Sequence, residues 1–397
     1  MITINKERLL KEFHEQGAIG WIDGEGLFRP SYSKEYYRAR DFVKEKMEEA
    51  GLSTHVDSVG NLFGKLEGAQ KRNRTILLGS HLDSVNGGGY YDGALGIMGG
   101  LEAIRGIKEE GIQPRHSLEV AAFIAEEGSN LGGTFGSRSF IGGFENYPQE
   151  DILKGYGLNR NIIEKAKIDK NNYAAFFELH VEQGPVLWKE KVSVGIPTHI
   201  VGITRYLVTI FGESNHAGTT PMQNRKDALF EGSKIIYKWL DFMRKQSGIV
   251  GNVGVLNLFP GEIGVVPGKM EIRFEIRSDN KDKVNLSVGK IYELSKDLID
   301  CKAVIELWNE KDSVAMDESI IQHIENACRQ YGFSYKRMLS WASHDANPIA
   351  RVIPTGMIFV PSCRGLSHSK EEFSEDDDIV KGVQVLANAI VDLDMKI

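Results

Sequence analysis

Residues 75–93 read TILLGSHLDSVNGGGYYDG, a short apolar run that passes into a polar, glycine-rich segment. The run Thr75–Leu78 is typical of a buried strand. The segment after it carries one histidine, two aspartates and a glycine triplet, which suit a turn, a phosphate-binding loop or half of a metal site. No G-x-G-x-x-G motif or Walker lysine accompanies it, which argues against phosphate binding. The choice between a turn and a metal site depends on the rest of the chain.

Three further apolar runs have the same strand-like character, at residues 118–124, 174–177 and 355–360. Helical periodicity is found in residues 33–51 and 94–107. Strands and helices therefore alternate along the chain. This alternation predicts an α/β fold with a mainly parallel sheet and helices on both faces.

The pattern changes between residues 205 and 316. There we expect the order β-α-β-β-α-β, the split βαβ plan of a small two-layer α+β domain. After residue 317 the chain returns to helices and a buried strand. We therefore expect a discontinuous catalytic domain, residues 1–204 and 317–397, with an inserted domain of residues 205–316.

Composition narrows the classes of function. The 397 residues include 48 Lys and Arg against 55 Asp and Glu, a formal net charge of −7, without a basic block. We therefore expect no nucleic-acid partner and no membrane association, and no apolar run reaches the roughly 20 residues that span a bilayer. Three widely spaced cysteines without a CxxC pair, and an N-terminal segment without a signal-peptide core, predict a cytoplasmic protein.

Polar clusters follow all four predicted strands, at the strand ends where open α/β sheets bind their ligands. The clusters contain His81, Asp83, Asp92, Glu126, Glu127, His180 and His368. Singly, each residue has an ordinary structural explanation, such as a turn for Asp92 or a solvated helix start for Glu126 and Glu127. Together, histidines and carboxylates suit Zn²⁺, Co²⁺ or Mn²⁺, and five such groups suffice for two ions that share a carboxylate.

Seven motifs together resemble the M20 metallopeptidase-like amidohydrolases. They are GSHLDSV (79–85), GGYYDG (88–93), AEEGS (125–129), ELHVEQGPVL (178–187), NHAGTTPM (215–222), SHDA (343–346) and FVPSCRGLSHSKEEF (359–373). The HVEQGPVL and HAGTTPM segments are similar to the hydantoinase/carbamoylase branch, which includes N-carbamoyl-L-amino acid hydrolases and allantoate amidohydrolases. The resemblance covers nearly the whole chain in the family's order.

The resemblance implies a centre with two divalent ions, Zn, Mn or Co. Its implied ligands are His81 and His180 for one ion, Glu127 and His368 for the other, and Asp92 as a bridge between them. Asp83 would fix the orientation of the His81 imidazole. Glu126 would be the general base that takes a proton from a water activated by the metal ions.

The resemblance also implies groups that hold the substrate. His216 of the inserted domain would reach the substrate oxyanion from a partner subunit, which implies a homodimer through that domain and a lid that closes. Gln183, Arg277 and His344 are the candidate substrate contacts. From the residues alone, a surface-turn histidine is the favoured interpretation of His216, and only the NHAGTTPM match reverses it. Arg277 could equally be a solvated strand-end arginine, and His344 part of a helix cap. Cys363 near His368 could suggest a thiol hydrolase, but no group that would orient the pair is evident, so we expect a packed or incidental thiol.

The chain departs from the family pattern at two positions. Asn130 replaces a common arginine, and Gly264 replaces an asparagine that touches substrate. We therefore expect hydrolysis of a linear C–N bond more firmly than any particular substrate. The leading reaction is cleavage of an N-carbamoyl-L-amino acid to the amino acid, CO₂ and NH₃, because residues 134–140 resemble the carbamoylases. The alternatives are an allantoate amidohydrolase, an aminoacylase or dipeptidase, and a non-catalytic binding protein.

Overall fold

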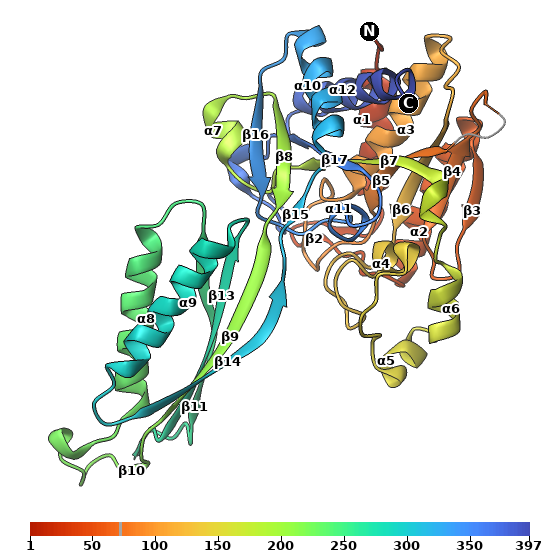
Figure 1. Ribbon diagram of the computed structural model, residues 1–397. Helices are drawn as coiled ribbons and strands as arrows, with labels where there is room; N and C mark the ends of the chain where they lie inside the picture. The colour runs from red at the N-terminus through yellow and green to blue at the C-terminus, as the bar shows by residue number, and fades with distance from the viewer. Residues whose placement is uncertain (71–73) are drawn as a thin grey trace. The chain divides into compact units, whose positions relative to one another are not determined.

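The computed structural model describes residues 1–70 and 74–397. The described chain forms two compact units (Figure 1). The larger unit combines Met1–Thr198 with Ala315–Ile397, and the smaller unit is the single segment His199–Val314. The smaller unit is thus an insertion in the sequence of the larger one.

A nine-stranded mixed sheet forms the centre of the larger unit. Its middle strands are parallel, in the order β17 (Thr355–Val360), β7 (Tyr173–Val181), β5 (Thr75–His81) and β6 (Ser117–Phe123). Beyond β6 lie the antiparallel strands β4 (Leu62–Leu66) and β3 (Ser53–Val56). The other edge carries β8 (Val194–Ile200), β15 (Val314–Ala315) and β16 (Tyr335–Ser340). The predicted α/β class is confirmed, with the parallel strands in the middle of a mixed sheet.

Helices pack on the parallel strands. α3 (Ala94–Glu109) and α12 (Asp376–Asp394) contact each other and β7, and α10 (Glu318–Tyr331) contacts α12 and β17. α11 (Ala346–Ile349) also contacts β7 and β17, and it packs against α4 (Phe135–Ile141). In Figure 1, α3, α10 and α12 lie above the strands, and α4 and α11 lie below them. The parallel strands are buried because helices cover them.

Further helices, short strands and turns complete the larger unit. They are α1 (Lys6–Gly17), β1 (Trp21–Ile22), β2 (Gly26–Leu27), α2 (Lys34–Glu49), α5 (Glu150–Gly155), α6 (Arg160–Lys165), α7 (Val186–Glu190) and the 3₁₀ turns η1 (Lys170–Asn172) and η3 (Cys363–Gly365). The side chain of Ser33 accepts the N–H of Tyr36 and so caps the start of α2. Across the described residues, no helix combines the length and the apolar character that crossing a membrane requires.

The smaller unit has an antiparallel sheet in the order β11 (Val250–Phe259), β13 (Lys269–Ser278), β9 (Gly202–Phe211) and β14 (Lys302–Lys311). Burial alternates along β13, so the sheet has one apolar face. That face packs against α8 (Ala228–Arg244) and α9 (Lys281–Lys296), where Trp239 meets Phe274 with ring centroids 4.9 Å apart. Beyond the sheet lie the 3₁₀ turn η2 (Met222–Asn224) and a pair of short strands, β10 (Asn215–His216) and β12 (Val265–Val266).

Candidate metal centre

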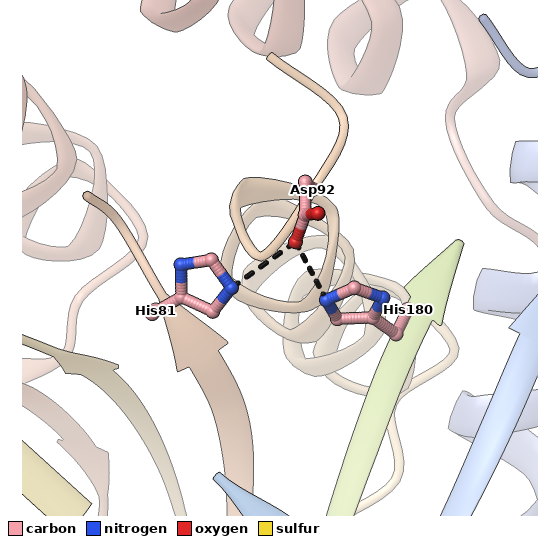
Figure 2. A group of neighbouring side chains, drawn as sticks. All are labelled: His81, Asp92 and His180. Carbon is pink, nitrogen blue, oxygen red and sulfur yellow. Dashed lines mark hydrogen bonds and ion pairs between the residues drawn. The ribbon is translucent and has the colours of Figure 1, made fainter. Parts of the chain in front are cut away.

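The buried side chains of His81, Asp92 and His180 meet at the carboxyl ends of two adjacent parallel strands (Figure 2). His81 ends β5, and His180 is the last residue but one of β7. Asp92 lies two residues before α3, which packs against both strands. Its Oδ1 atom is 3.1 Å from Nε2 of His81 and 3.0 Å from Nε2 of His180. One carboxylate oxygen therefore faces two imidazoles.

Backbone carbonyls fix the tautomer of both rings. Nδ1 of His81 lies 2.9 Å from the carbonyl oxygen of Asp83, and Nδ1 of His180 lies 2.9 Å from that of Val181. A carbonyl oxygen only accepts hydrogen bonds, so each Nδ1 carries a proton and each Nε2 presents a lone pair in the neutral ring. Nε2 of His180 also lies 3.2 Å from the N–H of Gly93, and the two Nε2 atoms with the Asp92 oxygen between them are nitrogen and oxygen ligands of the kind that divalent metal ions take. The donor set therefore fits a divalent ion.

A second group shares the same aspartate. Nε2 of His368 lies 3.4 Å from Oδ2 of Asp92 and 3.4 Å from Oε1 of Glu127. His368 follows β17 and Glu127 follows β6, so all four parallel strands contribute a residue. The structure thus brings together the five residues that the sequence designates as ligands, in two groups that meet at Asp92. This arrangement suits a carboxylate that bridges two ions.

Sparsely populated backbone conformations gather at this centre. Ala125, Gln183 and His368 have φ values of 57°, 57° and 54°, in the left-handed region that side-chain-bearing residues rarely adopt. Ala125 directly precedes Glu126, and the other two are themselves candidate site residues. Such conformations cost free energy and persist where the surrounding structure enforces them, as at functional sites.

Asp83 supports the site in a different way from the one expected. Its carboxylate lies 4.0 Å from Nδ1 of His81, whose hydrogen-bond partner is the Asp83 backbone carbonyl. The carboxylate instead accepts the backbone N–H groups of Glu126 and Glu127, one on each oxygen, both at 3.2 Å. Asp83 therefore orients His81 through its backbone and the two glutamates through its side chain.

The carboxylates of this centre have divergent pKa values. Burial raises the pKa of Glu126 well above its usual value, and the charge of Glu127 adds to this effect. Burial and the charge of Asp92 raise the pKa of Glu127 to about 7. Burial acts in the same direction on Asp92, but contacts with His180, His368 and His81 outweigh it and hold its pKa well below the usual value. Neighbouring carboxylates whose pKa values differ in this way suit different roles. Glu126 and Glu127, with raised pKa values, can act as acid or base, whereas Asp92 stays an anion.

Two of the expected substrate residues lie at the metal centre. Nε2 of Gln183 donates a hydrogen bond to Oδ2 of Asp92 at 2.6 Å, and it lies 3.5 Å from Nε2 of His368. His344 is only 1% exposed, and its ring packs edge-on against His180 with centroids 4.4 Å apart. Its Nε2 lies 2.9 Å from Oγ of Ser340. His344 therefore lies behind His180, one of the candidate metal ligands.

His216 and Arg277 belong to the smaller unit. Nδ1 of the exposed His216 accepts the backbone N–H groups of Gly218 and Thr219 at 3.0 and 3.2 Å. This nitrogen is therefore an acceptor, and Nε2 carries the proton and is free to donate. Arg277 is the last residue but one of β13, and its Nε atom donates a hydrogen bond to Oε1 of Glu275 at 2.8 Å.

The two departures from the family pattern lie in loops. The carbonyl of Gly264 accepts the N–H of Ala217, so the loop with Gly264 braces the one with His216. Asn130 lies between Gly128 and Gly132 after the two glutamates.

Cys363 does not have the surroundings of a nucleophile. Burial and the nearby Glu375, whose Oε1 is 3.9 Å from the sulfur, raise the pKa of its thiol. The thiolate is the reactive form of cysteine, so a raised pKa disfavours thiol hydrolysis. The alternative raised by the sequence has no support in this geometry.

Two buried glutamates next to the centre lie within the motifs 178–187 and 359–373, but the sequence assigned neither of them a role. Glu178 converges with His180 and His344, but its oxygens already accept from Oγ of Ser80 at 2.6 Å and from the N–H of Ala346 at 2.7 Å. Glu372 accepts three hydrogen bonds, from the backbone N–H groups of Tyr91 and Asp92 and from the hydroxyl of Ser367. In the sequence, Glu178 directly follows the predicted strand 174–177 and Glu372 is one of several acids in a polar run, so nothing distinguished either residue from its neighbours.

Comparison with known proteins identifies relatives over the full length of the chain. The profile of Peptidase family M20/M25/M40 matches residues 77–392. The N-carbamoyl-L-amino-acid amidohydrolase of Pseudomonas sp. (strain NS671) is 34% identical, covering 98% of this chain and 99% of the relative. The allantoate amidohydrolase of Bacillus subtilis (strain 168) is also 34% identical, covering 93% of each chain. The crystal structure of an amidase of the hydantoinase/carbamoylase family from Burkholderia multivorans superposes with a TM-score of 0.88 at 29% identity, covering 98% of both chains.

Proposed function

The chain belongs to Peptidase family M20/M25/M40, and from that premise we propose that it is a metal-dependent amidohydrolase of N-carbamoyl-L-amino acids. The reaction releases the amino acid, CO₂ and NH₃ by hydrolysis of a ureido C–N bond. The observation that carries the proposal is the pair of histidine–carboxylate groups that share Asp92, with Glu126 beside them. The curated relatives that this chain matches along its length support the ureido substrate.

The proposed cofactor is a pair of divalent ions, Zn, Mn or Co. His81 and His180 would hold one ion, Glu127 and His368 the other, and Asp92 would contact both. Two ions in such a site supply Lewis acidity, which polarises a substrate carbonyl and lowers the pKa of water. The carbonyls that accept from Nδ1 of His81 and His180 keep both Nε2 atoms turned toward Asp92.

Glu126 is the proposed general base. Its Oε2 atom lies 4.0 Å from Nε2 of His81, so the carboxylate borders the ligand group without completing it. It takes the proton of the attacking water and passes that proton to the leaving nitrogen as the C–N bond breaks. Burial raises its pKa, which lets the carboxyl group hold the proton between these two steps.

His216 is the proposed donor to the oxyanion that develops on the substrate carbonyl. Because Nδ1 accepts two backbone N–H groups, the ring presents Nε2–H to the substrate. We propose that a partner subunit supplies this residue, which makes the working unit a homodimer formed through the inserted domain, residues 205–316, acting as a lid. Arg277, Gln183 and His344 complete the proposed substrate site, and the guanidinium of Arg277 suits the substrate carboxylate.

A second candidate is the allantoate reaction. The Bacillus subtilis relative has the same sequence identity to this chain as the carbamoylase, 34%, and Gly264 has no side chain with which to recognise a substrate. We place the protein in the cytoplasm, because its three cysteines are free. A small-molecule substrate accounts for the site without a nucleic-acid or membrane partner.

A substrate panel tests the proposal. The full chain, supplied with Mn²⁺, Co²⁺ or Zn²⁺, is assayed with N-carbamoyl-L-amino acids, allantoate, N-acetyl amino acids and dipeptides. We expect ammonia release to be fastest with an N-carbamoyl-L-amino acid. Preference for allantoate would select the second candidate, and release of acetate or of two amino acids would overturn the ureido assignment. Glu126→Gln should lower kcat by about 10²–10⁴-fold with metal content unchanged, and a fully active variant would overturn the role of Glu126.

A further inference from the structure

We infer that Glu372 is a positioning residue, which ties the segment of Asp92 to the segment of His368 so that the two ligand groups can share one aspartate. The inference rests on the proposed function, because it assigns Glu372 a role toward the metal centre proposed there. Glu372 lies in the loop between His368 and α12 and is only 5% exposed.

Each carboxylate oxygen of Glu372 holds a different segment. Oε1 accepts the backbone N–H groups of Tyr91 and Asp92, both at 3.0 Å. Oε2 accepts the hydroxyl of Ser367 at 2.6 Å, and Ser367 directly precedes His368. The two segments are far apart in the chain, since Asp92 and Ser367 are separated by 275 positions. Oγ of Ser367 also lies 3.3 Å from Oδ2 of Asp92, so the Glu372 carboxylate braces a direct contact between two parts of the centre that no local sequence links.

Glu372 acts through other residues and not as a ligand. Oε1 is taken by two backbone donors and Oε2 by a hydroxyl, and Glu372 is not a member of the ligand groups found among the described residues. Its removal would leave the N–H groups of Tyr91 and Asp92 buried without an acceptor, which is unfavourable. The Asp92 segment would then shift to satisfy them, and the carboxylate that both ligand groups share would lose its alignment.

The glycine triplet explains how Glu372 reaches this position. A Cβ atom on Gly89 would lie 2.4 Å from Cβ of Glu372 and 2.5 Å from its Oε1. Both distances are far below van der Waals contact, so Gly89 leaves the space that the glutamate occupies. Gly89→Ala would therefore displace Glu372 without removing its charge, which provides an independent test of position.

Four variants of the full chain separate position from charge. Glu372→Ala removes both contacts, whereas Glu372→Gln keeps an oxygen for the two backbone N–H groups and an amide N–H that can donate to Ser367. Gly89→Ala displaces the intact carboxylate. Glu371→Ala is the matched control, because it removes the same charge from the neighbouring, exposed residue, whose side chain contacts Ser369.

Two readouts are needed, and neither is catalytic activity. Calorimetric titration with Mn²⁺ should show affinity weakened by about 10–100-fold in Glu372→Ala and Gly89→Ala. The glutamine variant should stay within a few-fold of wild type, and Glu371→Ala should match it. Hydrogen exchange of the metal-free chain, followed by mass spectrometry, should be faster in the peptide that contains Tyr91 and Asp92 in the two weakened variants. Circular dichroism establishes that each variant is folded.

Several outcomes would overturn the inference. Wild-type Mn²⁺ affinity and exchange in a folded Glu372→Ala chain would show that the contacts do not position the site. Equal losses in the glutamine and alanine variants would assign the effect to charge. If the alanine variant does not fold, the comparison of Glu372→Gln with Gly89→Ala decides. If wild type binds no divalent ion, the proposed function fails, and the exchange of the metal-free chain still decides the role of Glu372.

Discussion

Oδ1 of Asp83 accepts the backbone N–H of Glu126 at 3.2 Å, and its other oxygen accepts the next N–H along the chain. Asp83 follows β5 and the glutamate follows β6, and these strands are neighbours in the parallel sheet. The carboxylate is buried, at 2% exposure. A residue at one strand end therefore determines where the proposed base at the next strand end can lie.

Asp83→Asn tests this support. An asparagine presents one acceptor oxygen and one NH₂ group, so one of the two backbone N–H groups would face another donor. We expect kcat/KM to fall by about 10–100-fold, as when the partners of metal-site groups are replaced, with the fold retained by circular dichroism. Asp23→Asn, an exposed change of the same chemistry, should be neutral. Wild-type kinetics in Asp83→Asn would mean that the two glutamates are held by other contacts.

The proposed contribution of His216 from a partner subunit predicts complementation. His216→Ala and Glu126→Gln should each be nearly inactive as homodimers. In a mixed dimer, one site combines Glu126 of one chain with His216 of the other, so random mixing should restore about a quarter of wild-type activity. Activity measured after mixing and re-equilibration tests this expectation. Mixed dimers without recovered activity would show that His216 acts within its own chain or not at all.

Stability should depend on pH through Glu325 of α10. The hydrogen bond from Arg337 of β16 holds the pKa of Glu325 below its usual value, against the effect of burial. A lowered pKa stabilises the folded chain above the unfolded pKa of about 4.3, and this contribution is lost as the pH falls through the folded pKa. Arg337 also donates to both carboxylate oxygens of Glu318. Because Arg337→Ala removes both glutamate contacts, it should lower the free energy of unfolding by about 1 kcal/mol at pH 7, and by less near pH 3.

Denaturant unfolding at both pH values measures this difference. Lys336→Ala is the matched control, because the ion pair of Lys336 with Glu190 is more exposed, and it should change stability less. A loss in Arg337→Ala that is the same at pH 3 and pH 7 would contradict the assignment.

Sequence reasoning was most successful where a pattern is local. The apolar run 75–78 and those near residues 118, 174 and 355 predicted the four parallel strands, because buried parallel strands are continuously hydrophobic. Since parallel strands share one carboxyl edge, the polar residues that follow them were expected to meet. His81, His180 and His368 do lie around Asp92.

Relationships between distant segments were beyond such reasoning. The Asp83 side chain was expected to contact His81, yet its oxygens face the backbone after the neighbouring strand. The packing of His344 against His180 joins two segments whose spacing in the sequence gave no sign of contact. Glu372 was assigned no role, although it lies in the motif 359–373, because two of its contacts are with residues about 280 positions away. Side-chain direction within a loop depends on the tertiary structure, which local spacing does not encode.

We propose that the two groups that share Asp92 hold two divalent ions. Elemental analysis of the full chain, loaded with Mn²⁺ and freed of unbound ions, tests it most directly. The account predicts about two ions per wild-type chain, and close to none in Asp92→Ala, since both groups lose their common member. A metal-free chain with full hydrolase activity, or an Asp92→Ala chain that keeps both ions, would contradict it.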